Sequence, residues 1–301
     1  MRTAVRPPPG RTADGAGTHS RPAEGDPAAT ALRSPAGPLS VAAGTLDGMD
    51  ITEHLERLRL DGTLLADAAD AAGPDARVPA CPEWQVRDLV SHIGRVHHGA
   101  AQFLTDRAER PGRFPEAPEL ADSELIPWLR EGHRLLVATL TAAPPDLTVW
   151  TFLPAPSPLA FWARRQAHET AVHRVDAQQA AGMALSPLPA AFAADGIDEL
   201  LAGFHSLDRS SVRTDVPRTL RVRATDVADA DWTVHLSTEP PRTVRTGTAE
   251  SGPAPQEPAD STVEGPAEEL YLALWNRLPW DGLTVTGDPA PVRLWQEKAG
   301  I

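Results

Sequence analysis

The 301-residue sequence has a single cysteine, Cys81, which excludes a framework of internal disulfides and favours a reducing compartment, the cytoplasm. It has no apolar run of about 18 residues, so we expect no transmembrane helix, and the N-terminal arginines precede no apolar stretch of the kind found in secretory signals. The formal net charge of −13 lacks the basic excess that nucleic acids and anionic membranes attract.

Lysine is also nearly absent, since Lys298 is the only one among 28 basic residues. Arginine, alanine and proline are abundant instead, a bias that fits a GC-rich genome such as those of actinobacteria. Apolar residues make up 41% of the chain, enough for a packed core, and the length suggests about two domains.

Large apolar residues are scarce in residues 1–48, which are rich in Pro, Gly, Ala and Arg. Such a segment buries too little surface to offset the entropy lost on ordering. We interpret it as a disordered N-terminal extension.

Helical periodicity begins after this extension and covers residues 50–72, 85–108, 122–142 and 158–182. Glycine or proline follows most of these segments, as expected at helix ends. Four helices of this length predict a four-helix bundle, which we place at residues 49–184.

The pattern changes in residues 185–301, where short alternating runs replace long helical ones. We expect a small α+β domain there. Its predicted helices are 189–207, 266–279 and 289–300, its predicted strands are 218–225, 231–238, 242–247 and 282–288, and a loop is predicted at 248–261.

One helical segment contains Glu169 and His173, four residues apart and therefore on one helix face. A carboxylate and an imidazole so placed can share a divalent metal ion, although a solvated Glu–His pair gives the same pattern. His168 is turned away by about 100° and is expected to be a bystander.

A metal site needs a further ligand, and the second helical segment offers His92, His97 and His98. His98 lies opposite the apolar stripe and is expected to be solvated. His92 and His97 lie at opposite edges of the stripe, and periodicity alone does not choose between them.

The segments "VPACPEWQVRDLVSHIGRVHHGA" (78–100) and "WARRQAHETAVHRVDAQQAAG" (162–182) resemble the second and fourth helices of the mycothiol-dependent maleylpyruvate isomerase family. The run from "PAEELYLALWNRL" to "GLTVTGDPAPVRLW" is similar to the end of that family's sequence. The resemblance implies a fold of class α plus α+β, a DinB-like four-helix bundle followed by a small sterol-carrier-like α+β domain.

The resemblance also implies a metal site formed by His92, Glu169 and His173, because His92 stands in the matching "LVSHIG" context. Two histidines and one carboxylate leave coordination positions open, as in catalytic zinc sites. Zinc is the first choice, with nickel and iron left open. Mycothiol is the implied thiol cofactor, and Arg277 is the candidate for stabilising negative charge on the substrate.

The implied reaction is cis–trans isomerisation of a maleylpyruvate-like substrate, or transfer of the thiol to another small electrophile. Two alternatives are a non-catalytic protein that binds metal and a small ligand, and a hydrolase using metal-bound water with His168 or an unplaced acid as base. We expect a structural role for Cys81, a supporting role for Asp176 beside the His173 ring, and a solvated face for Arg164 and Arg165.

Overall fold

The computed structural model describes residues 49–246 and 258–300, so the predicted disordered extension at 1–48 lies outside the described residues. Most of the loop predicted at 248–261 also lies outside them. In the described part, no helix is both long enough and apolar enough to cross a membrane.

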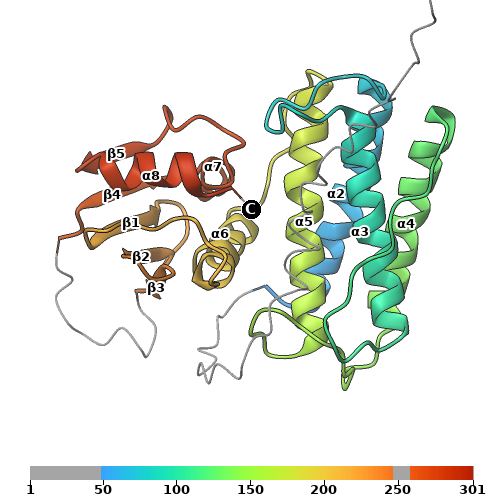
Figure 1. Ribbon diagram of the computed structural model, residues 1–301, viewed down its shortest axis with the longest axis horizontal. Coiled ribbons are helices and arrows are strands. Elements are labelled where there is room, and N and C mark those ends of the chain that lie inside the picture. Colours follow the sequence, from blue (N-terminus) through green and yellow to red (C-terminus); the bar gives the residue numbers. More distant parts are fainter. Residues whose placement is uncertain (1–48, 247–257, 301) are drawn as a thin grey trace, which may run out of the picture.

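The N-terminal half is the predicted bundle of four helices: α2 (Ile51–Ala72), α3 (Val86–Thr105), α4 (Asp122–Ala142) and α5 (Pro158–Ala180). The first backbone N–H groups of a helix lack partners within the helix. At the start of α2 the Asp50 side chain accepts a hydrogen bond from the backbone N–H of Glu53. Figure 1 shows α5 between α2 and the C-terminal half, with α3 and α4 on the far side.

Helix α5 is buried on nearly every side, with 17 of its 23 residues buried. Many of these residues are polar, among them Arg165, Gln166, His168, Arg174 and Asp176. Buried charges persist only when they are paired. The helix is therefore held by ion pairs and hydrogen bonds as well as by apolar contacts, and it is where the chemistry-bearing side chains gather.

The predicted helix at 189–207 consists of three consecutive segments with different helical hydrogen bonding. Helix α6 (Ala190–Asp198) runs into the π-helical η1 (Glu199–Gly203) and the 3₁₀ turn η2 (Phe204–Ser206). π-helical turns often occur at functional sites, and this one lies against α5.

The C-terminal half is a five-stranded sheet in the order β3-β2-β1-β4-β5, with β1 parallel to β4 and the other pairs antiparallel. Helices α7 and α8 pack against the central strand β1 and its neighbour β4 (Figure 1). The elements are β1 (Arg218–Ala224), β2 (Asp231–Leu236), β3 (Arg242–Arg245), β4 (Ser261–Gly265), β5 (Thr284–Gly287), α7 (Ala267–Leu274) and α8 (Ala290–Lys298).

Two sequence predictions in this half are wrong in detail. Strand β4 was not predicted, because it begins at the last residue of the run read as loop and only Thr262 and Val263 among its five residues are strand formers. The helix predicted at 266–279 ends at Leu274. Asn276 there has φ +58°, a left-handed conformation that asparagine tolerates and a helix does not.

Candidate metal centre

The fold brings together the three residues of the predicted metal site. His92 projects from α3 and meets Glu169 and His173 of α5, and their ligand atoms all lie within 4.8 Å of one another. His92 Nε2 is 3.2 Å from Glu169 Oε1, and His173 Nε2 is 3.6 Å from the same oxygen.

The donor set fits a divalent cation. Around a tetrahedral zinc ion with bonds of about 2.0–2.1 Å, ligand atoms stand roughly 3.3 Å apart. The observed separations of 3.2 and 3.6 Å are close to this value. Two imidazole nitrogens and one carboxylate oxygen would leave a coordination position for a further ligand, although this geometry alone does not name the metal.

The Nδ1 atom of His173, which faces away from Glu169, is hydrogen-bonded to a carboxylate. His173 Nδ1 lies 2.9 Å from Asp176 Oδ2, as the sequence suggested. Asp176 in turn accepts from Nε and Nη2 of Arg277, each at 3.0 Å. Burial alone would raise the pKa of Asp176, but Arg277 and His173 lower it to about 2. The chain His173–Asp176–Arg277 thus connects the cluster to the C-terminal half.

The second oxygen of Glu169 is fixed in a similar way. Arg165 Nη2 donates to Glu169 Oε2 at 3.0 Å, and Arg165 also donates to Glu199 in η1. Burial would raise the pKa of Glu169, but His173, His92 and Arg165 hold it well below its ordinary value. Both ligands on α5 are therefore connected, each through one intermediate, to a charged residue of the C-terminal half.

Without a metal, the cluster binds a proton on His173. Burial opposes its charged form, but Asp176 and Glu169 raise its pKa to about 9. Burial dominates at His92 and lowers its pKa despite the bond to Glu169. Because a metal binds the neutral imidazole, a cation entering this site displaces a proton.

Trp84 covers the cluster. Its ring stacks on His173 with centroids 6.2 Å apart and lies 5.1 Å from the ring of His92. The other two histidines of α3 lie elsewhere. His97 is fully buried against Thr170, and His98 is half-buried under Trp128 rather than solvated as predicted.

His168 belongs to a different cluster. His168 Nε2 and His54 Nε2 lie 2.8 and 3.0 Å from the same oxygen of Asp195, in α6. This trio also has the spacing of a metal site. Arg164 Nε donates to that oxygen at 2.9 Å, so a cation there would face a guanidinium. The cluster serves instead as an ion-pair contact between the two halves.

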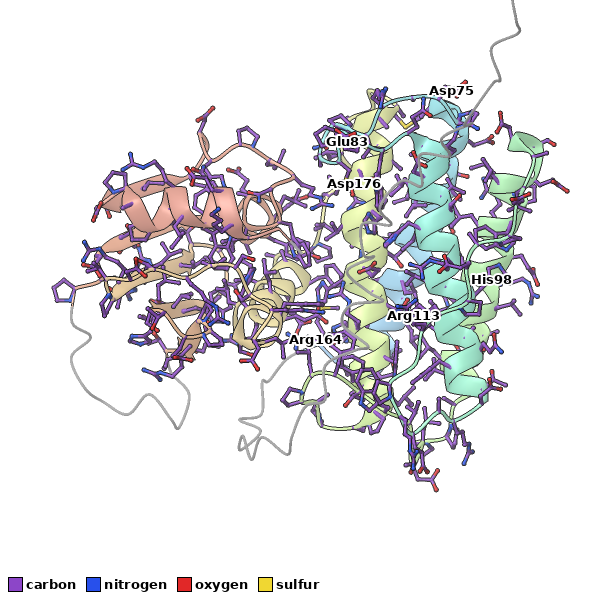
Figure 2. The ribbon with its side chains drawn as sticks, in the orientation of Figure 1. Asp75, Glu83, His98, Arg113, Arg164 and Asp176 are labelled. Carbon is purple, nitrogen blue, oxygen red and sulfur yellow. The ribbon has the colours of Figure 1, made fainter. Side chains whose placement is uncertain are left out.

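The prediction that Arg164 and Arg165 lie on a solvated face is therefore wrong. Both bind carboxylates of the C-terminal half, and Arg165 is only 3% exposed. Figure 2 shows Arg164 and Asp176 near opposite ends of α5. The sequence pattern could not reveal this, because the partner acids Asp195 and Glu199 lie some 30 residues later.

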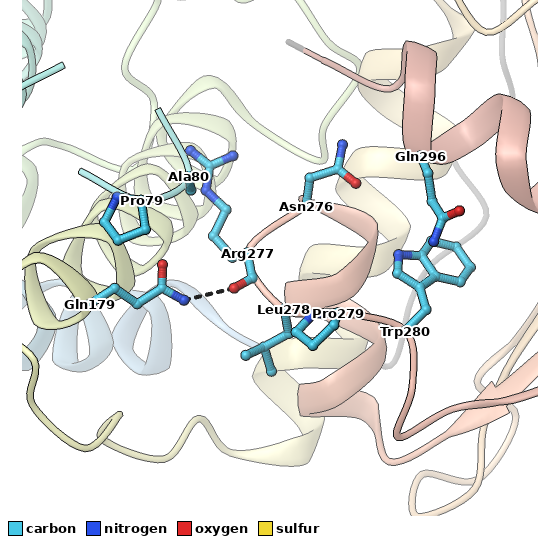
Figure 3. A pocket seen from close by; sticks show the side chains of 9 residues that line it. All are labelled: Pro79, Ala80, Gln179, Asn276, Arg277, Leu278, Pro279, Trp280 and Gln296. Atoms are coloured by element: carbon cyan, nitrogen blue, oxygen red, sulfur yellow. Dashed lines mark hydrogen bonds between the residues drawn. The ribbon is translucent and has the colours of Figure 1, made fainter. Parts of the chain in front are cut away.

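A pocket of about 530 Å³ opens between the halves beside Arg277. Figure 3 shows the Arg277 side chain reaching toward Ala80, while Gln179 Nε2 donates to the Arg277 carbonyl at 2.7 Å. Cys81 Sγ lies 3.9 Å from Arg277 Nη2. Burial, together with Asp176, raises the pKa of the Cys81 thiol, which does not suit a nucleophile.

The sequence matches two family models: the mycothiol maleylpyruvate isomerase N-terminal domain over residues 55–178 and the C-terminal domain of the same family over 191–293. A search of curated proteins finds no match. The fold is similar to crystal structures of the mycothiol-dependent maleylpyruvate isomerase and a point mutant of it, with TM-scores of 0.53 and 0.54 and identities of 13% and 11%. Each match covers 79% of this chain and 93% of the other. The chain belongs to the mycothiol-dependent maleylpyruvate isomerase family.

Proposed function

We propose that the protein is a metal-dependent enzyme that uses mycothiol as its thiol cofactor. The observation that carries the proposal is the convergence of His92, Glu169 and His173. The atoms of Glu169 and His173 that face away from the cluster are already hydrogen-bonded, to Arg165 and Asp176. Family membership supports the choice of thiol. Zinc is the metal that this ligand set favours, and the cytoplasm is where such a thiol is kept reduced.

A bound divalent cation would lower the pKa of a coordinated thiol, so that it reacts as a thiolate at neutral pH. The chain's own contribution is to hold the site. Asp176 accepts the Nδ1 proton of His173 and leaves Nε2 as the ligand atom. Arg165 orients Glu169.

Arg277 has a narrower role than the sequence suggested. Its Nε and Nη2 donate to Asp176, its Nη1 donates to the Trp275 carbonyl, and its Nη2 also donates to Cys81 Sγ, which leaves one of its five N–H groups. This group can donate to negative charge that develops on a substrate in the pocket. We therefore propose that Arg277 positions His173 through Asp176 as well as contacting the substrate.

The reaction we propose is addition of the thiolate to a cis double bond conjugated to a carbonyl. The electron pair moves to the carbonyl oxygen, the former double bond rotates, and expulsion of the thiolate restores the double bond in its trans form. If the adduct takes up a proton instead, the outcome is transfer of the thiol to the electrophile.

The test is turnover of maleylpyruvate with and without mycothiol. The proposal expects turnover only with the thiol, and loss of at least about 100-fold in His92→Ala, since removal of a metal ligand abolishes activation of the thiol. His98→Ala, on the same helix, is the matched control and should retain activity.

Formation of a mycothiol conjugate with another electrophile would support transfer rather than isomerisation. Metal binding with neither reaction would favour the alternative, a protein that binds metal and a small ligand without catalysis. The hydrolase alternative has lost its histidine base, because His168 is bonded to Asp195 and Tyr271, and it would need an acid instead.

A further inference from the structure

Arg209, just after η2, has a buried N–H group without an acceptor. Its Nη2 atom is shielded from solvent and has no hydrogen-bond partner among the described residues. The side chain is half-buried, and its guanidinium lies over the ring of Phe204 at 5.4 Å. Within the described part of the chain, no carboxylate pairs with it.

A second orphan donor lies against the same ring. Trp275 packs on Phe204 with centroids 6.0 Å apart, and its indole Nε1 is buried without a partner. Two shielded N–H donors around one phenyl ring are unusual, because buried polar groups in proteins are nearly always bonded.

Arg165 connects this place to the candidate metal centre. Its guanidinium also lies over Phe204, at 4.8 Å, while donating to Glu169 and Glu199. The charge of Arg165 is thus balanced by two carboxylates, whereas that of Arg209 is not. Burial and the nearby Arg165 lower the pKa of Arg209 to about 10, a sign that its charge lacks a counterion.

An arginine that served only to pack on Phe204 would leave its N–H groups in water. Here the Nη2 group is withdrawn from water and left unbonded, which costs folding free energy unless a bound ligand or water supplies the acceptor. One unbalanced positive charge matches one negative charge, and a guanidinium fork matches a carboxylate.

We propose that Arg209 and Trp275, packed around Phe204, form an anion subsite that binds a carboxylate of the substrate. The subsite rests on the proposed function, because Arg165 places it beside Glu169 of the metal centre. It adds a specificity-determining arginine to the proposed reaction. In this arrangement α3 and α5 hold the metal, while the segments after η2 and α7 bind the substrate's negative charge.

The test is calorimetric binding of succinate, an unreactive dicarboxylate, to the metal-loaded protein. We expect succinate to bind and succinamide, its neutral analogue, not to bind. Arg209→Gln should weaken succinate binding at least tenfold, and Trp275→Phe, which keeps a ring and removes the N–H, should weaken it less. Arg223→Gln, which removes an exposed arginine of β1, is the matched control and should change nothing.

A purely structural arginine would give a different result. If Arg209 only supported the fold, Arg209→Gln would lower the melting temperature and leave the affinity of the folded protein for succinate unchanged. The subsite predicts the reverse, an unchanged or higher melting temperature with weaker binding, because an unbalanced buried charge has been removed. Equal binding of succinate by wild type and Arg209→Gln overturns the proposal, as does binding of inorganic phosphate in preference to succinate.

Metal content and thiol dependence measured on the same samples separate this proposal from the proposed function. Arg209→Gln should keep its metal and lose succinate. A protein that carries no metal but still binds succinate through Arg209 would refute the metal enzyme and uphold the subsite. A metal-loaded, thiol-dependent protein whose succinate binding is unchanged in Arg209→Gln would uphold the metal enzyme and refute the subsite.

Discussion

Asp176 is the residue on which the candidate metal centre most depends without being a ligand. Its side chain is fully buried. It accepts a hydrogen bond from His173 on one side and forms an ion pair with Arg277 on the other. The sequence suggested its support of His173 from a spacing of three residues along a helix. It could not suggest Arg277 as the partner, which lies 101 residues away.

We predict that Asp176→Asn weakens zinc binding by about 10–100-fold, because the carboxylate no longer orients His173 or strengthens it as a ligand. Competition with a chromogenic chelator measures the affinity, on protein shown by circular dichroism to be folded. Asp122→Asn removes an exposed acid of α4 and is the control. Equal zinc affinities for the Asp176 variant and wild type would show that the His173–Asp176 bond has no part in the site.

His205 is a second buried residue with a measurable consequence. Its Nδ1 bonds to Ser210 Oγ at 3.0 Å and its Nε2 has no partner in the described structure. Burial, together with Arg209, lowers its pKa to about 4. In the unfolded chain the ordinary pKa is about 6.5, so below that pH the unfolded state binds the proton first and stability falls as pH falls toward 4.

We therefore predict that the wild type loses about 2–3 kcal/mol between pH 7 and pH 4.5 through His205 alone. His205→Phe keeps a ring against Trp295 and should lose that much less over the same range. Urea unfolding at the two pH values measures the difference. Parallel losses in both proteins would mean that His205 is accessible to protons in the folded state.

At the scale of elements, α5 is held against the C-terminal half by ion pairs with α6 and η1. The sequence predicted α2 to α5 within three residues at each end, because helical periodicity and, for most of them, a following Pro or Gly agree there. It did not predict the π-helical turn η1, since the winding of those five residues is set by tertiary contacts. It is η1 that brings Glu199 to Arg165.

We predict that Glu199→Gln lowers the free energy of unfolding by about 2 kcal/mol, since the buried Arg165 loses one of its two carboxylate partners and keeps only Glu169. Glu264→Gln breaks the Arg223–Glu264 pair, which is partly exposed, and should cost less than about 1 kcal/mol. Chemical denaturation of both variants gives the comparison. Similar losses for the two would contradict the importance given to the buried pair.

For the molecule as a whole, the sequence predicted two halves of the correct classes but not how they meet. Each half has its own local signals, helical or alternating periods. The interface has none, because its pairs join residues far apart in sequence, such as His54 with Asp195 and His168 with Tyr271. The orphan donors of Arg209 and Trp275 are also visible only after folding.

Two chains of bonded side chains, His173–Asp176–Arg277 and Glu169–Arg165–Glu199, connect the candidate metal centre to the C-terminal half. We predict that zinc slows hydrogen exchange in residues 266–280 as well as in α3 and α5, because the metal holds His173, which holds Asp176 and Arg277. Exchange mass spectrometry of the protein with zinc and with a chelator reports this. Protection confined to the bundle would mean that the halves respond independently.

The central claim is that one divalent cation is bound by His92, Glu169 and His173. Its most direct test is elemental analysis of purified wild type, His92→Ala, Glu169→Ala and the control His98→Ala. We predict about one divalent ion per chain in the wild type and in the control, and loss of the ion in the two ligand variants. Retention of the ion in both His92→Ala and Glu169→Ala would contradict the assignment of this site.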